Sequence, residues 1–475
     1  MRSYDAWLVI AILSACHVTG CAVGPDYRRP TAAGDATVPA QFANSSTPGV
    51  GEGSVDGAFW ASFGDPTLSA LVTDALAKNY DLKSALASLS ASRAATRLTR
   101  YNQIPTVTSS AGVSRGLESA RELPLFPRAE RQGTAFDVGF DASWELDFFG
   151  RVRREVEAAR TTEQAIEASV HDVQISVAAE VARNYFVLRG LQEQLAVAER
   201  NTKNQQNTLA ITQQRLAAGR GNELDTSRAE TQLQNTLASI PPLESAVSTT
   251  IYRLSGLTGR QPDTLTPLLR NTQPLPALPA LTAIGTPEEL LRRRPDVRMA
   301  ERQLAAATAR IGIAIGDLFP KVTFLGSIGY DAATISALGG RDSQVYSFGP
   351  SISWAAFDLG RVRSRITIAR ANADGALAAY QSVVLAALEE TEGSLVTYGR
   401  AQSRRATLEL AASASARAAA LANQRFQGGL TDFLNVLEAE RDALATQDAL
   451  AQSRAQAATS LVAVYKALGG GWTAL

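Results

Sequence analysis

The side chains that most often bind metal ions or act as nucleophiles are scarce in this chain of 475 residues, which contains two histidines and two cysteines. His171 stands four residues after Glu167, so a helix would place these two side chains on one face. A zinc site needs three or four ligands, and this pair falls short of that number. We therefore expect neither a metal centre nor nucleophile–histidine catalysis, and we assign no catalytic residue.

Cys21 suits a different chemistry, the covalent attachment of lipid. An apolar run at 6–15 follows Arg2, which is typical of an export signal. The segment Val18-Thr19-Gly20-Cys21 resembles the lipobox of bacterial lipoproteins. The prediction is a signal peptide over 1–20 and a mature chain with N-palmitoyl and S-diacylglycerol groups on Cys21 and no other cofactor. An ordinary cleavage site and an inner-membrane anchor are the alternatives, although the anchor is too short to span a bilayer.

Three carboxylates mark one face of a predicted strand. Between 136 and 147 apolar and polar residues alternate, and Asp137, Asp141 and Glu145 all fall on the polar side. Segments of about ten residues with this alternation are typical of transmembrane β-barrels, whose polar face lines a lumen. The interpretation is that the three carboxylates line such a lumen. A soluble antiparallel sheet with one wet face gives the same pattern, so both readings stay open at this point.

An internal duplication organises the elements that position these residues. Ser143-Trp144 recurs as Ser353-Trp354, and the residues from Gly150 to Arg153 recur from Gly360, both at an offset of 210 residues. Upstream matches, such as Asp81 with Asp296, have an offset of 215. The predicted organisation is a signal peptide (1–20), an N-terminal linker or equatorial segment (21–60), repeat 1 (61–265), a Pro-rich joint (266–287) and repeat 2 (288–475).

Each repeat is predicted to contain a helix, two strands, a long helix, a turn and a return helix. Residues 66–101 predict the first helix of repeat 1. Neither 151–217 nor 361–427 contains proline, and each predicts a helix of 67 residues, about 100 Å long. Return helices are expected at 222–257 and 432–468, with a kink in the first at its Pro-Pro pair. The turns between the long and return helices carry Gly219, Gly221, Gly428 and Gly429.

The strand count and the charge balance limit the architecture. Two strands per repeat give four per chain, which cannot close a barrel, and open sheet edges are not tolerated in lipid. Three chains supply twelve strands, an even number within the known range. Lys and Arg total 46 and so do Asp and Glu, so the basic excess of a nucleic-acid binder is absent. We therefore expect a trimer of tandem-repeat protomers that does not bind nucleic acid.

Several motifs point to one family. They are Gly24-Pro25-Asp26-Tyr27, Phe63-Gly64-Asp65-Pro66, the segment from Trp144 to Arg151, Arg294-Pro295-Asp296, Phe319-Pro320 and the segment from Phe357 to Arg361. Together they resemble the TolC-like family of outer-membrane efflux channels, in particular its OprM/NodT-type lipoprotein branch. The resemblance runs from Cys21 almost to the C-terminus.

The resemblance implies a fold and a function. The fold would be mainly α with a small transmembrane β part: three protomers share a 12-stranded β-barrel on a long periplasmic α-helical barrel. The function would be that of a non-enzymatic exit duct for drugs or other small toxic compounds, lipid-anchored in the outer membrane. Its partners would be outer-membrane lipid, a periplasmic adaptor and an inner-membrane pump of the resistance-nodulation-division type. The alternatives are a channel for type I protein secretion and a non-transporting coiled-coil lipoprotein.

The resemblance also implies a periplasmic gate just beyond the glycine turns. The residues that match the constriction of the family are Asp225, Arg228, Leu434, Asn435, Glu438 and Arg441. Threefold repetition would bring three copies of Glu438 around one axis, with Leu434 forming an apolar ring beside them. The like charges would repel unless Arg228 or Arg441 pairs with them. A solvated helix face is the alternative for this set.

Overall fold

The computed structural model describes residues 22–30, 39–44, 58–279 and 284–470. The predicted signal peptide and Cys21 lie outside these residues. The chain is mainly helical with one four-stranded sheet, which confirms the predicted fold class. It divides into two compact units. The described part of unit 1 comprises 22–30, 88–166 and 299–380, and that of unit 2 comprises 39–44, 58–87, 167–279, 284–298 and 381–470.

The order of elements repeats along the chain as the sequence predicts. The first series is η1 (Phe59–Phe63), α2 (Pro66–Lys78), α3 (Tyr80–Tyr101), β1 (Thr106–Leu117), α4 (Arg128–Arg131), β2 (Gln132–Leu146), α5 (Arg151–Ala217), α6 (Glu223–Leu257), η2 (Pro262–Leu265) and α7 (Thr266–Leu269). The second series is α8 (Pro287–Arg293), α9 (Pro295–Gly316), β3 (Lys321–Ala332), η3 (Ile335–Ala337), η4 (Arg341–Ser343), β4 (Gln344–Ser353), α10 (Leu359–Gln427) and α11 (Phe433–Ala467). Both compact units take segments from both series, so the repeats are not separate domains.

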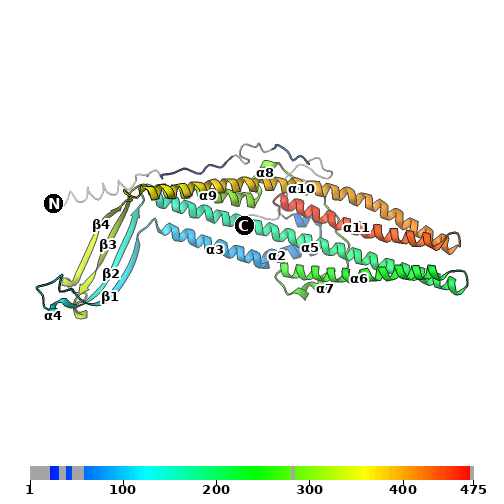
Figure 1. Cartoon of the computed structure of the whole chain (residues 1–475), viewed down its shortest axis with the longest axis horizontal. Helices are drawn as coiled ribbons and strands as arrows, with labels where there is room; N and C mark the ends of the chain where they lie inside the picture. The colour runs from blue at the N-terminus through cyan, green and yellow to red at the C-terminus, as the bar shows by residue number, and fades with distance from the viewer. Residues whose placement is uncertain (1–21, 31–38, 45–57, 280–283, 471–475) are drawn as a thin grey trace. The chain divides into compact units, whose positions relative to one another are not determined.

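In unit 1 the strands form one antiparallel sheet in the order β1-β2-β3-β4 (Figure 1). Phe140 of β2 lies opposite Ile328 of β3, which lies opposite Tyr346 of β4, so these side chains share one face. Equivalent tryptophans hold the two hairpins in equivalent ways. The indole N–H of Trp144 donates to the Gln103 carbonyl at 3.1 Å, and that of Trp354 donates to the Leu318 carbonyl at 2.9 Å. The duplication in the sequence is therefore also a duplication in structure.

The prediction of one helix over 66–101 is wrong, because the segment breaks at Asn79 into α2 and α3. Asn79 has φ −58° and ψ 135°, which is not helical. Its side-chain oxygen accepts hydrogen bonds from the N–H groups of Asp81 and Leu82 at 2.8 and 3.1 Å. An N-cap of this kind supplies acceptors for the first amides of α3, which have no partner within the helix.

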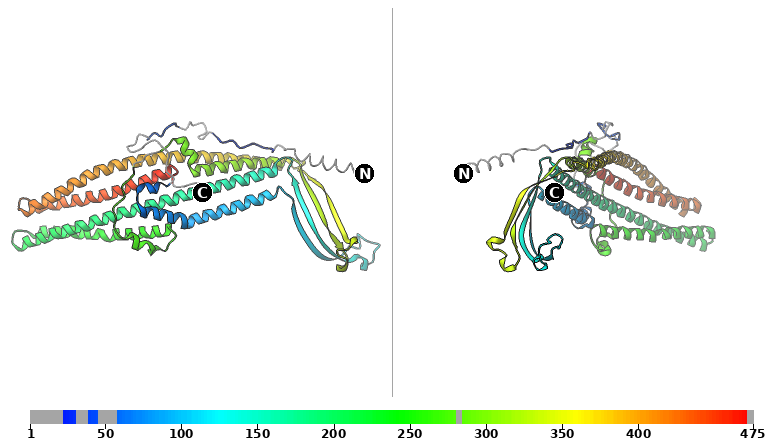
Figure 2. Two further views of the ribbon diagram at one scale, coloured as in Figure 1. Left: turned by 180° about the vertical axis from the view of Figure 1, so that it is seen from behind. Right: turned by 60° about the vertical axis from the view of Figure 1, so that its left-hand side comes forward.

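Unit 2 contains two helical hairpins, α5 with α6 and α10 with α11, which lie next to each other in both views of Figure 2. The α5 helix spans 67 residues with the predicted bounds, and α10 spans 69. The α6 helix continues through Pro241 and Pro242 without ending. A core of buried side chains from η1, α2, α5, α6, α10 and α11, including Phe59, Tyr185 and Leu461, joins the bases of the hairpins. None of the described helices is long and apolar enough to cross a membrane.

Candidate functional site

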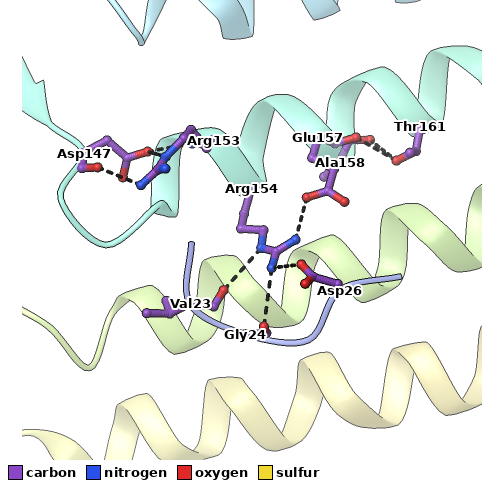
Figure 3. Close-up of polar contacts among 9 residues, drawn as sticks. All are labelled: Val23, Gly24, Asp26, Asp147, Arg153, Arg154, Glu157, Ala158 and Thr161. Atoms are coloured by element: carbon purple, nitrogen blue, oxygen red, sulfur yellow. Dashed lines mark hydrogen bonds and ion pairs between the residues drawn. The ribbon is translucent and has the colours of Figure 1, made fainter. Parts of the chain in front are cut away.

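In unit 1, an irregular segment at residues 22–30, here called the N-terminal strap, is held by Arg154 of α5 (Figure 3). The guanidinium donates to the carbonyl oxygens of Val23 and Gly24 at 3.2 and 3.4 Å. It also donates to the Asp26 carboxylate at 2.6 Å. Only 5% of the Arg154 side chain is exposed, so this charge is buried and fully paired rather than solvated.

The strap also fits closely against α9 of the second repeat. Gly24 has φ 95°, and a Cβ added there would meet the Cα of Gly312 at 2.6 Å, so only glycine fits. The Tyr27 hydroxyl donates to Glu301 at 3.1 Å. Burial, and then the negative charge of Glu301, raise the pKa of Tyr27, so the hydroxyl keeps its proton and remains a donor. These contacts give the Gly-Pro-Asp-Tyr motif a structural role, although Cys21 itself lies outside the described residues.

The predicted lumen carboxylates occupy one face of β2, as the pleat requires. Asp137 lies between Gly112 of β1 and Asp331 of β3, and Asp141 lies between Thr108 and Ser327. Asp331 therefore adds a fourth carboxylate to the face. Like charges directly opposite each other in a sheet repel, and this repulsion is smallest where water reaches them.

Glu145 differs from the other two predicted carboxylates. Its two oxygens accept hydrogen bonds from Arg151 at 2.8 and 2.6 Å, so its charge is neutralised where β2 leads into α5. The assignment of Asp137, Asp141 and Glu145 to a lumen stays a prediction, because it concerns an assembly of several chains.

At the far end of unit 2, both hairpins turn at a glycine with positive φ: Gly219 at 69° and Gly429 at 75°. The backbone hydrogen bonds of the two turns match at an offset of 210. The Gly219 N–H donates to Leu216 at 3.0 Å, and the Gly429 N–H donates to Phe426 at 2.9 Å. Neither Gly221 nor Gly428 has positive φ, but a Cβ on Gly221 would meet the Leu216 nitrogen at 3.0 Å. The predicted glycine turns are therefore present, with Gly219 and Gly429 as the left-handed residues.

A groove of about 1170 Å³ lies between the two turns of one chain. Three of the predicted gate residues, Asp225, Arg228 and Leu434, line this groove. Phe426 and Phe433 form part of its wall, with their ring centres 5.6 Å apart. The turns of one chain thus bring half of the predicted gate set around one opening.

The remaining gate residues lie on α11 and do not line the groove. Arg441 donates to the side-chain oxygen of Gln232 on α6 at 2.8 Å, and Asn435 donates to Thr431 at 2.9 Å. Glu438 is exposed. No ion pair joins Glu438 to Arg228 or Arg441 within the described part of this chain. The cross-chain gate stays a prediction.

A second charged cluster in unit 2, which the sequence did not indicate, surrounds Arg294 at the start of α9. Its guanidinium contacts Asp296 at 2.7 Å, Glu390 of α10 at 2.6 Å and the carbonyl of Ala467, at the end of α11, at 2.7 Å. Burial opposes the charge, but the bonds to Asp296 and Glu390 outweigh it and raise the pKa of Arg294. Burial, assisted by the charge of Asp296, raises the pKa of the nearby Asp172 carboxyl.

The equivalent contact in repeat 1 uses a neutral side chain. Asn79 donates to the carbonyl of Leu257, at the end of α6, at 2.9 Å. Leu257 corresponds to Ala467 at the offset of 210, and Asn79 corresponds to Arg294 at the offset of 215. Each repeat therefore ties its return helix to the break before the following helix. Among the described residues, no group of three or more His, Cys, Asp or Glu side chains could hold a metal ion.

Comparison with known proteins identifies the family. The family described as "Outer membrane efflux protein" matches residues 71–260 and 286–470, which cover most of both repeats. The chain belongs to this family. As an outer membrane efflux protein it is a transport protein, not an enzyme, and it resides in the outer membrane. The family predicted from the motifs is confirmed.

Relatives agree over nearly the whole length of this efflux protein. Nodulation protein T of Rhizobium leguminosarum bv. trifolii is 28% identical over 455 residues, covering 96% of this chain and 95% of that protein. The solvent efflux pump outer membrane protein SrpC of Pseudomonas putida is 32% identical, covering 96% of each chain. The structure of the outer-membrane channel OprN is 41% identical with a TM-score of 0.89, covering 95% of this chain and 100% of that one.

Proposed function

We propose that three copies of this chain form the outer-membrane exit duct of a tripartite efflux system. In this assembly the sheets join through β1 and β4 into a shared 12-stranded β-barrel, and the hairpins form an α-helical barrel in the periplasm. The observation that carries the proposal is the sheet itself. Its edge strands β1 and β4 each have one partner in the described chain. In lipid both edges must be paired, and further copies supply the missing strands.

The exposed side chains of the sheet suit this arrangement. On one face, Val107 is 63% exposed, Phe140 58%, Phe348 74% and Ile352 69%, so large apolar groups lie uncovered on three strands. The other face carries the carboxylates and small polar residues. An apolar outer face and a polar lumen are what a barrel in lipid requires. The duct itself performs no chemistry, and passage through it is passive.

The cargo we propose is small toxic organic compounds, delivered by an inner-membrane pump of the resistance-nodulation-division type through a periplasmic adaptor. The name of the SrpC relative refers to solvent efflux, which supports this class. The groove between the hairpin turns is the surface we propose for the adaptor. Efflux names among the relatives favour this function over type I protein secretion.

The test is restoration of efflux in a strain that lacks its own outer-membrane efflux channels. The chain is expressed with each of several adaptor–pump pairs, and accumulation of a hydrophobic dye is measured. At least one pair should lower dye accumulation, and a pump variant without its proton relay should not. Unchanged accumulation with every pair, although the protein is assembled in the outer membrane, would contradict the proposal.

We also propose that Cys21 carries the lipid anchor, N-palmitoyl and S-diacylglycerol. The strap supports this placement, because it fixes residue 22 beside Gly150, just after β2: a Cβ on Gly150 would meet the Cα of Ala22 at 2.5 Å. The acyl chains would therefore start close to the end of a membrane strand.

Replacement of Cys21 with serine is expected to abolish acylation and leave export intact, because the apolar signal is unchanged. Metabolic labelling with palmitate should mark the wild type and not the variant. Cys16→Ser is the matched control, because it removes the other cysteine and should keep the label. Label on the Cys21→Ser protein would refute the lipid anchor.

A further inference from the structure

One arginine joins the two hairpin turns of a single chain. Nη2 of Arg215, near the end of α5, donates to the Phe426 carbonyl at 2.6 Å and to the Gln427 carbonyl at 3.4 Å. Its guanidinium carbon lies 4.1 Å from the centre of the Phe426 ring. These carbonyls end α10, where the last C=O groups lack helical partners and positive charge is favourable. Arg215 therefore holds the end of α5 against the end of α10.

The second repeat contains the same arginine without the same contact. Arg425 corresponds to Arg215 at the offset of 210, and the turn after it has the same backbone hydrogen bonds. Its side chain is exposed and has no hydrogen bond or ion pair in the part of the chain that the structure describes. The residue that corresponds to Phe426 is Leu216, which is 38% exposed where Phe426 is 6% exposed. One half of a repeated arrangement is filled within the chain, and the other half is open.

The same asymmetry runs along the helices. Ile175 and Phe186 of α5 are 3% and 0% exposed, whereas Leu385 and Val396, which correspond to them in α10, are 57% and 43% exposed. Phe186 belongs to the core that also contains Leu461 of α11. In α10 no described element covers the two corresponding positions. Exposed apolar side chains at positions buried in the equivalent helix indicate a surface that another chain covers.

We propose that α10 of one copy packs against α6 of the next copy as α5 packs against α11 within one chain. At the turns, Arg425 then donates to the carbonyls of Leu216 and Ala217 of the neighbouring copy, at the end of its α5. The partner is a second copy of this chain, because its α5 ends in the same turn that Arg215 meets at the end of α10. This inference rests on the proposed trimeric duct.

The duplication keeps the arginine at the seam between copies but not the other polar pairs. Within the chain, α5 and α11 are joined by Thr208–Glu440 at 2.8 Å, Asn201–Gln447 at 3.3 Å and Glu193–Arg454 at 2.7 Å. The corresponding residues at the seam between copies are Ala418 with Glu230, Ala411 with Leu237 and Ser403 with Glu244. The first two pairs cannot form a side-chain hydrogen bond, and the third cannot form an ion pair, so Arg425 is the main polar tie of the seam. The seam between copies is therefore easier to separate than the one within a chain.

Cross-linking of matched cysteine pairs tests which helices meet across the seam. Ala411→Cys with Leu237→Cys, treated with a short thiol cross-linker in the assembled protein, should give covalent dimers and trimers on denaturing gels. The matched pair Asn201→Cys with Gln447→Cys should cross-link within one chain and leave the monomer mass unchanged. Monomers alone from the first pair, with the second pair reacting, would overturn the proposal. Dye efflux by the uncross-linked variants is scored separately, so loss of the seam and loss of the function are distinguished.

The role of Arg425 is tested through the exposure of Leu216. In a Leu216→Cys background, Arg425→Ala should speed maleimide labelling of the assembled protein by about tenfold, because one charge-assisted hydrogen bond no longer closes the seam. Arg425→Lys keeps the charge but not the guanidinium fork and should give an intermediate rate. Arg417→Ala, an exposed arginine on the same helix that bonds only Ser413, should leave the rate unchanged. Equal labelling rates in all four proteins would refute the contact.

Discussion

Replacement of Arg294 with alanine is expected to lower the free energy of unfolding by about 3 kcal/mol, because the loss of one partner leaves half-buried carboxylates unpaired. Arg294 is 10% exposed and holds Asp296, Glu390 and the last carbonyls of α11 at once. The measurement is the temperature at which the detergent-resistant oligomer dissociates on gels, together with the thermal transition by circular dichroism. Both should fall by several degrees, with the return helix α11 detaching first.

Arg292 provides a control on the neighbouring helix. It pairs with Glu288 at 2.6 Å, but both side chains are about two-thirds exposed (66% and 69%). Exposed pairs of this kind contribute about 0–1 kcal/mol, so Arg292→Ala should change the transition little. Equal transitions for the Arg294 and Arg292 variants would show that the cluster around Arg294 does not hold the base of the hairpins together.

The joint replacement of Arg228 and Arg441 with serine is expected to open the periplasmic end of the duct. Closure depends on their pairing with Asp225 and Glu438 across chains, and without it these carboxylates repel. A net ~1 kcal/mol per chain, with three chains moving together, gives about 3 kcal/mol, a shift of over a hundredfold in the open population. Cells that lack a pump should then become sensitive to large antibiotics, measured as the inhibitory concentration.

Arg200→Ser, at an exposed position on α5 away from the turns, is the control for this experiment and should leave sensitivity unchanged. Arg441 bonds Gln232 within the chain, so Gln232→Ala separates the loss of that bond from the loss of the charge. If the double variant is assembled but no more sensitive than wild type, these residues are a solvated helix face and closure lies elsewhere.

The sequence predicted the elements that local chemistry determines. The bounds of α5 and the two hairpin loops, 118–131 and 333–343, follow from prolines, glycines and the change from helical to alternating periodicity, and the structure has them. The break at Asn79 was missed because a single asparagine weakens a helix only slightly. Its counterpart Arg294 precedes Pro295, so comparison of the repeats would have indicated the break.

The contacts that sequence did not predict join residues far apart in the chain. Arg154 and Asp26 are separated by 128 positions, and Arg215 and Phe426 by 211. Asp331 joins the carboxylate face only because β2 pairs with β3, a pairing between the two repeats. No local pattern encodes such partners, whereas the offset between the repeats, once known, predicts where an equivalent contact is open.

The central claim, that copies of this chain form a continuous duct, is tested most directly by single-channel recording of the purified oligomer in planar lipid bilayers. The account predicts discrete, uniform conductance steps from the wild type and larger steps from the Arg228, Arg441 double variant. A well-folded, detergent-stable oligomer that inserts but produces no conductance steps, in the wild type and in the double variant alike, would contradict it.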